Sequence, residues 1–136
     1  MNVESQWPVM PNLPVSWGEV FDKLTILEIK SEKLSDPVQL HNVERERMEI
    51  ERVVGDRTCF PAELDEWIRQ LRVINSKLWD IEEAKRDCER RQCFDEVFIQ
   101  LARRVYIDND RRASIKRSIN GLLGSAIVEE KSHATY

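Results

Sequence analysis

Eight polar side chains in this sequence fall on helix faces that are otherwise apolar, and their types are the ones that could do chemistry. When one residue is placed every 100° around a helix, each of them lies within an apolar stripe or at its edge. They are two glutamates, three cations and three asparagines: Glu28, Glu82, Arg47, Arg112, Lys116, Asn75, Asn109 and Asn120. Because an unpaired buried charge is strongly destabilising, these groups must bind one another, water or a ligand.

Two arrangements of these eight residues agree with their charges. In the first, the two glutamates neutralise the three cations inside a helix bundle, the asparagines complete the hydrogen bonds, and the network only fixes how the helices pack. In the second, Arg112, Lys116 and Asn109 face a cleft and bind an anionic small molecule. The sequence leaves both arrangements open.

Motifs of the familiar catalytic and cofactor sites do not occur in the chain. It has no glycine-rich phosphate loop and no H-E-x-x-H. Residues 130–133 are its one Glu-x-x-His, whereas the di-iron bundles need two. The paired carboxylates 82–83 and 129–130 resemble those of metal-dependent helical nucleotide pyrophosphatases, but the further acids that those enzymes need are not at the expected spacing. Cys59, Cys88 and Cys93 form neither a disulfide framework nor a zinc ligand set. We therefore expect no cofactor and no metal.

Capping signals and apolar periodicity divide the chain into four helices that position these residues. Ser16 is a helix N-cap, and Glu19 three residues later completes a capping box. Asp36 and Pro37 start a second helix, because proline is favoured in the first turn, and Gly124 is a natural C-cap for the last helix. The predicted helices cover residues 16–34, 37–54, 61–90 and 94–123.

The short connections between these helices predict an all-α fold, a four-helix and mostly antiparallel bundle over residues 16–124. The last two helices form a long hairpin, and the shorter first two pack against it. Residues 1–15 contain three prolines and predict an extended N-terminal arm. We expect this arm to lie along the bundle and to bury its apolar side chains, and residues 125–136 to form a short C-terminal tail.

The composition is that of one globular domain. The chain has 136 residues, of which 41% are hydrophobic and 34% charged, with a net charge of −4. Neither half carries the basic surface of a nucleic-acid-binding protein. No apolar run approaches the roughly 20 residues that span a bilayer, and no signal peptide is evident. We expect a cytoplasmic protein without a membrane span.

The first predicted helix is apolar on two sides. Leu24 and Leu27 lie on its main apolar face, whereas Ile26 and Ile29 lie on the opposite side. Such a helix is either central in the fold or covered on its outer side by another segment or subunit. Because homo-oligomers are mostly two-fold dimers, the sequence predicts a homodimer interface through Ile26 and Ile29, with coverage by the N-terminal arm as the alternative.

Several stretches of the chain together resemble a known family. They are Ser16–Glu19 with Asp22–Lys30, then Leu78–Glu82, then Asn109–Arg112 with Ile115–Lys116 and Ile119–Asn120, and finally Gly124–Ser125 with Glu129–Ser132. Over residues 14–136 the chain resembles the bacterial family DUF6165, small helical proteins of unknown function. The resemblance brings no activity with it and implies only an association with glycan-building enzymes.

The function expected on these grounds is that of a non-enzymatic binding or adaptor module, which serves a protein partner or a second copy of the chain. The resemblance adds a link to bacterial envelope glycan synthesis. The alternative is an enzyme or sensor that binds a phosphorylated or nucleotide-sugar ligand at the cleft containing Arg112 and Lys116.

Overall fold

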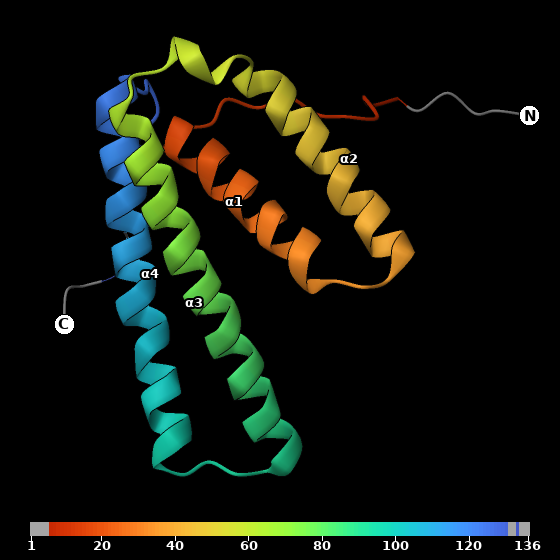
Figure 1. The fold of residues 1–136 in the computed structure, drawn as a ribbon, viewed down its shortest axis with the longest axis vertical. Helices are drawn as coiled ribbons and strands as arrows, with labels where there is room; N and C mark the ends of the chain where they lie inside the picture. The colour runs from red at the N-terminus through yellow and green to blue at the C-terminus, as the bar shows by residue number, and fades with distance from the viewer. Residues whose placement is uncertain (1–5, 131–132, 134–136) are drawn as a thin grey trace, which may run out of the picture.

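The computed structural model describes residues 6–130 and 133. This part of the chain contains four α-helices, one short 3₁₀ turn and no β-strand (Figure 1). The elements are α1 (Trp17–Lys33), α2 (Pro37–Val54), the turn η1 (Arg57–Cys59), α3 (Glu63–Arg91) and α4 (Glu96–Leu123). The predicted all-α class and four-helix arrangement are confirmed.

The helix ends follow the capping signals of the sequence. The hydroxyl of Ser16 accepts a hydrogen bond from the backbone N–H of Glu19 at 3.2 Å, so Ser16 is the N-cap of α1. Gly124 ends α4 in the left-handed conformation, with φ of 64°. The third and fourth helices each begin two residues later than predicted. For α4 the reason is that Asp95 is the N-cap, and its carboxylate accepts a backbone N–H of the first turn.

The central helix of the fold is α1, because it packs against each of the other three helices. Figure 1 shows α2 running back along α1, and the longer α3 and α4 forming a hairpin beside them. The core comprises Val20, Phe21, Leu24, Val54, Leu64, Leu71, Ile74, Ile115 and Ile119. A central position explains why α1 is apolar on two sides.

The second apolar side of α1 is covered within the single chain. Ile29 has only 1% of its surface exposed, and Asn75 of α3 donates hydrogen bonds to Asp22 and Thr25 on the same side of the helix. The prediction that Ile26 and Ile29 form an outward-facing dimer strip is therefore wrong for Ile29. Ile26 is half-buried and lines a cleft.

The hairpin of α3 and α4 extends well beyond the other two helices (Figure 1). Lys33, the last residue of α1, lies 3.9 Å from the carboxylate of Asp80 in α3. Residues 81–91 therefore continue α3 past the end of α1 by about 16 Å, at 1.5 Å per residue. The same length of α4 accompanies them.

The N-terminal arm leaves its apolar side chains in solvent. Trp7, Val9 and Leu13 are 71%, 90% and 70% exposed. The prediction that the arm buries these side chains along the bundle is wrong, because the second side of α1 is already covered by α3. None of the described helices combines the length and the hydrophobicity needed to cross a membrane.

Candidate functional site

The carboxylate of Asp22 in α1 is the centre of a polar cluster that joins three helices. Asp22 is 1% exposed. Asn75 of α3 donates from Nδ2 to Oδ1 of Asp22 at 2.9 Å, and Nε of Arg112 in α4 donates to the same oxygen at 2.8 Å. A terminal nitrogen of Arg112 donates to Oδ2, so the pair is bidentate.

The carboxylates of the cluster keep its two cations charged. The hydrogen bonds that Arg112 donates to Asp22 raise the pKa of Arg112 and outweigh the effect of its burial. Burial lowers the pKa of Lys116, but Glu19, Asp22 and Glu129 more than compensate, so this pKa is raised as well. Lys116 Nζ donates to Glu19 at 2.7 Å and to Glu129 at 3.1 Å, and lies 3.9 Å from Asp22.

Asn120 ties the end of α4 to the start of α1. Its Oδ1 accepts the backbone N–H of Gly18 at 2.7 Å, and the hydroxyl of Ser125 accepts that of Trp17 at 3.0 Å. These bonds satisfy N–H groups that have no partner within α1 itself. A Cβ atom on Gly18 would lie 2.5 Å from the carbonyl oxygen of Lys116, so only glycine permits this approach of the two helices.

A cleft of about 780 Å³ lies between α1, α3 and α4, with the start of α2 at its edge. Its volume is within the roughly 300–1,000 Å³ of typical ligand sites. The lining includes the apolar residues Ile26, Ile29, Leu34, Leu78 and Trp79, and the polar residues Gln39, Asn75, Glu82, Glu83, Arg86, Asn109 and Arg112. The polar cluster therefore forms part of the cleft wall.

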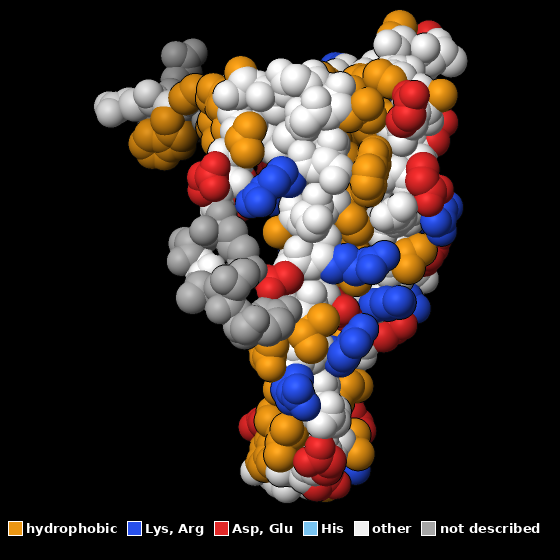
Figure 2. All heavy atoms as spheres, turned by 90° about the vertical axis from the view of Figure 1, so that its left-hand side faces the viewer, with side chains coloured by type: hydrophobic (Ala, Val, Ile, Leu, Met, Phe, Trp, Pro, Cys, Tyr) orange, Lys and Arg blue, Asp and Glu red, His pale blue; other side chains and the backbone are white. Residues whose placement is uncertain are grey.

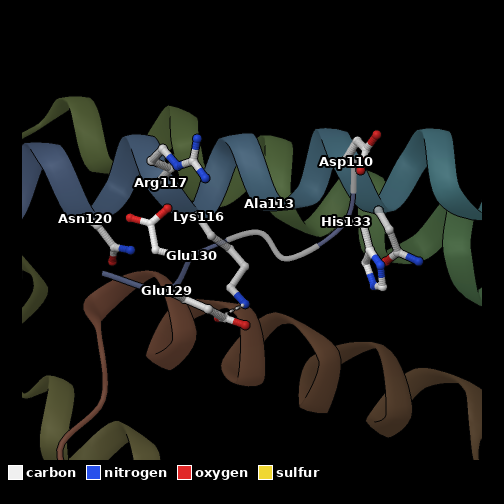
Figure 3. A pocket seen from close by; sticks show the side chains of 9 residues that line it. Asp110, Ala113, Lys116, Arg117, Asn120, Glu129, Glu130 and His133 are labelled. Carbon is white, nitrogen blue, oxygen red and sulfur yellow. Dashed lines mark hydrogen bonds and ion pairs between the residues drawn. The ribbon is translucent and has the colours of Figure 1, made fainter. Parts of the chain in front are cut away.

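A second cavity of about 260 Å³ lies on α4 beneath the C-terminal segment (Figure 3). It is lined by Asn109, Asp110, Ala113, Lys116, Arg117, Asn120, Glu129, Glu130 and His133. Figure 3 shows Lys116 extending from α4 toward Glu129, with which it forms an ion pair. Since acids and bases both line this cavity, its charges are balanced internally.

Six of the eight predicted site residues line these two cavities, and two do not. The cleft contains Asn75, Glu82, Asn109 and Arg112, and the smaller cavity contains Asn109, Lys116 and Asn120. Glu28 and Arg47 lie elsewhere. The structure thus places six of the eight residues at two cavities, and a functional role for the whole set stays a prediction.

The hydrogen-bonded partners of Glu28 and Arg47 are residues other than those expected, although the charge of Glu28 still helps to raise the pKa of Arg47, after the larger effects of Glu44 and Glu51. Glu28 accepts a hydrogen bond at 2.6 Å from Arg72 of α3, a residue that the sequence reasoning missed. Arg47 pairs with Glu44 and Glu51 on its own helix, α2. Acids three and four residues away on the same helix can bind a cation in place of acids on other helices, and here Glu44 and Glu51 bind Arg47 in this way.

Glu82 also pairs locally. Its carboxylate lies 3.4 Å from Lys85 and is half exposed, so it contributes to the rim of the cleft rather than to the neutralisation of Arg112 or Lys116.

Asp22 is the main residue that the sequence reasoning missed, although a signal for it exists. Asp22, Ile26 and Ile29 lie four and three residues apart and share one helix face. A buried Ile29 therefore implies a buried carboxylate at Asp22, which needs a cation. Asp108 of α4 was missed as well. It is 2% exposed, and one of its oxygens has no partner in the described chain.

Metal ligands do not gather anywhere in the described residues: no three or more His, Cys, Asp or Glu side chains are placed to hold an ion. Cys59, Cys88 and Cys93 are free thiols.

Comparisons with known proteins give one result. Neither the curated proteins nor the solved structures contain a match to this chain. The model of a family of unknown function, DUF6165, matches residues 12–136. This range covers nearly the whole chain and includes all the stretches in which the resemblance was seen. The chain belongs to the DUF6165 family.

Proposed function

We propose that this domain is a non-enzymatic binding module whose ligand site is the cleft between α1, α3 and α4. The observation that carries the proposal is the mixed lining of the cleft, which combines Leu78 and Trp79 with the amide groups of Gln39 and Asn109. Ligand sites typically use apolar surface for affinity and a few convergent polar groups for orientation. Both are present in a cleft of suitable volume.

The charges of the polar cluster favour an uncharged ligand over a phosphorylated one. Arg112 already binds Asp22 through two nitrogens, and Lys116 binds Glu19 and Glu129. A phosphate that took either cation would leave a carboxylate without its partner, and for Asp22 that carboxylate is fully buried. This reasoning counts against the enzyme or sensor acting on a phosphorylated or nucleotide-sugar ligand.

Within this proposal the ligand is an uncharged saccharide. Amide side chains donate and accept hydrogen bonds at once, which suits the hydroxyl groups of a sugar. Trp79 offers a large apolar aromatic surface for the C–H side of a sugar ring. The link to bacterial envelope glycan synthesis that the family resemblance implies agrees with this ligand class, and the protein would serve that synthesis as a cytoplasmic adaptor.

A thermal-shift titration tests the proposal. Neutral oligosaccharides should raise the melting temperature of the wild-type protein in a dose-dependent way, by several degrees at about 100 times the Kd. Trp79→Ala should abolish the rise, whereas Arg117→Ala, in the other cavity, should retain it. If instead only phosphosugars or sugar nucleotides stabilise the protein, and Lys116→Ala removes that effect, the alternative function replaces this one.

A further inference from the structure

The projecting end of the α3–α4 hairpin has almost no core of its own. Between residues 81 and 107 only Cys88 is buried. Phe94, Val97 and Ile99 are 49%, 61% and 47% exposed. Figure 2 shows hydrophobic side chains gathered at this end of the molecule and a row of lysine and arginine side chains farther along the same face. These exposed side chains belong to the connecting loop and to α4, and apolar surface of this kind marks a site where another protein surface can bind.

Among the many charges on the projecting end are two matching pairs, and within the described part of the chain only the base on α3, Arg90, has an ion-pair partner, Asp87 at 3.5 Å. Glu83 and Arg90 lie seven residues apart on α3, and Glu96 and Arg103 lie seven residues apart on α4. Seven residues are close to two helical turns, so each acid lies on the same side of its helix as the base, about 10 Å away. All four side chains are exposed. On each helix the acid comes first and the base second.

The midpoints of these two pairs lie at the same level of the hairpin. Asn75 of α3 and Arg112 of α4 bind the same oxygen of Asp22, so these two residues lie at one level of the hairpin. Arg91 and Glu96 flank the connecting loop and define a second level. Along each helix, 16 residues separate the first level from the second. This register sets the middle of the α3 pair, residues 86–87, beside residues 100–101. The middle of the α4 pair, residues 99–100, is within about one residue, or 1.5 Å, of that level.

We propose that the projecting hairpin binds the same hairpin of a second copy, antiparallel and about a two-fold axis at the level of residues 87 and 100. In this arrangement α3 lies against α3 and α4 against α4. Each Glu83 then meets Arg90 of the second copy, and each Glu96 meets Arg103 of the second copy, which gives four ion pairs around the exposed apolar residues. The result is a closed four-helix bundle.

The pattern selects a second copy over an unrelated partner because it is self-complementary. A two-fold axis places the acidic end of each helix against the basic end of the same helix in the second copy. Attractive ion pairs form across the interface only if the acid and the base lie at equal distances from the axis. Both helices satisfy this condition at one level. The interface is distinct from the cleft, so the wild-type protein can form it with or without a ligand.

Charge exchange between two single variants tests the proposal. By light scattering and sedimentation, the wild-type chain of 16.1 kDa should form a dimer that weakens as salt is added. Arg103→Glu and Glu96→Arg should each weaken the dimer by about 10-fold or more, because each replaces two attractive pairs by two repulsive ones. A 1:1 mixture of the two variants should form a heterodimer of wild-type strength, since the attractive pairs return.

Arg117→Glu is the matched control, because it makes the same charge change at an exposed site of α4 outside the hairpin end. It should leave the dimer intact, and far-UV circular dichroism should show all variants equally helical. A wild-type chain that stays at 16.1 kDa up to millimolar concentration overturns the proposal. So does a dimer that resists both single variants, or a mixture that fails to recover association.

Discussion

Asp22→Asn removes the charge at the centre of the polar cluster while it keeps the side-chain volume. Arg112 then loses its bidentate carboxylate, and Lys116 loses a charge 3.9 Å away. Breaking a buried ion pair from one side costs roughly 3–5 kcal/mol. Because the side chain of Arg112 is 29% exposed and water can partly replace the lost oxygen, we expect the lower end, about 3 kcal/mol. For a domain of this size that corresponds to a fall in melting temperature of roughly 10 °C.

Urea unfolding of a double-mutant cycle with Arg112→Met measures how much of this loss belongs to the pair. The double variant should be more stable than the sum of the single effects implies, with a coupling free energy of about 2 kcal/mol. Arg69→Met is the control, because Arg69 binds Glu66 with equally short bonds of 2.6 and 2.8 Å but both side chains are more than half exposed. It should cost less than about 0.5 kcal/mol. If Asp22→Asn costs no more than this control, the reasoning about the cluster is refuted.

Three other changes test single contacts by urea unfolding. Gly18→Ala should destabilise the protein by about 2 kcal/mol, because its Cβ would force α1 away from the backbone of Lys116 and from Asn120. The pKa of Lys116 is raised in the folded protein, so its charge should stabilise the fold fully below its unfolded pKa of 10.5 and stop doing so as the pH rises through the higher folded value. The difference in the free energy of unfolding between wild type and Lys116→Met should therefore vanish at that higher pH. Arg47→Met should cost less than about 0.5 kcal/mol, because its partners Glu44 and Glu51 are half exposed; a larger loss would restore Arg47 to the network.

The helices could be predicted from the sequence because their signals are local. The N-cap hydroxyl of Ser16 and the left-handed conformation of Gly124 each depend on only a few neighbouring residues. The polar faces of α3 and α4 could be predicted for the same reason, since the helical period alone determines that Asn75, Arg112 and Lys116 lie among apolar side chains.

The partners of these polar residues could not be predicted, because they depend on how helices distant in sequence are placed against one another. Glu28 binds Arg72, which is 44 residues away, through the crossing of α1 and α3. Asp22 was missed for the same reason: the two apolar sides of α1 fit either a central helix or an outer interface, and only the packing of α3 against α1 distinguishes the two. The cleft is also a consequence of packing, because it forms between the helices where three of them meet.

Asp22 and Asp108 are equally buried, at 1% and 2% exposure, yet the loss of their charge should change the stability of the protein in opposite directions. Both oxygens of Asp22 have partners. Asp108 has one hydrogen bond, from Arg104 at 3.0 Å, and its Oδ2 has no partner in the described chain. A buried polar atom without a partner costs about 1–3 kcal/mol, and Arg104 is 52% exposed, so water can solvate it once the carboxylate is gone.

We therefore expect Asp108→Leu to stabilise the protein by about 1 kcal/mol, and Asp22→Leu to destabilise it by at least 3 kcal/mol. Asp108→Ala adds no volume and should change stability in the same direction as Asp108→Leu, which separates the effect of charge from that of overpacking. Urea unfolding at neutral pH measures all three. If both Asp108 variants lose stability as Asp22→Leu does, then Oδ2 of Asp108 does have a partner, and the contrast drawn between the two aspartates is wrong.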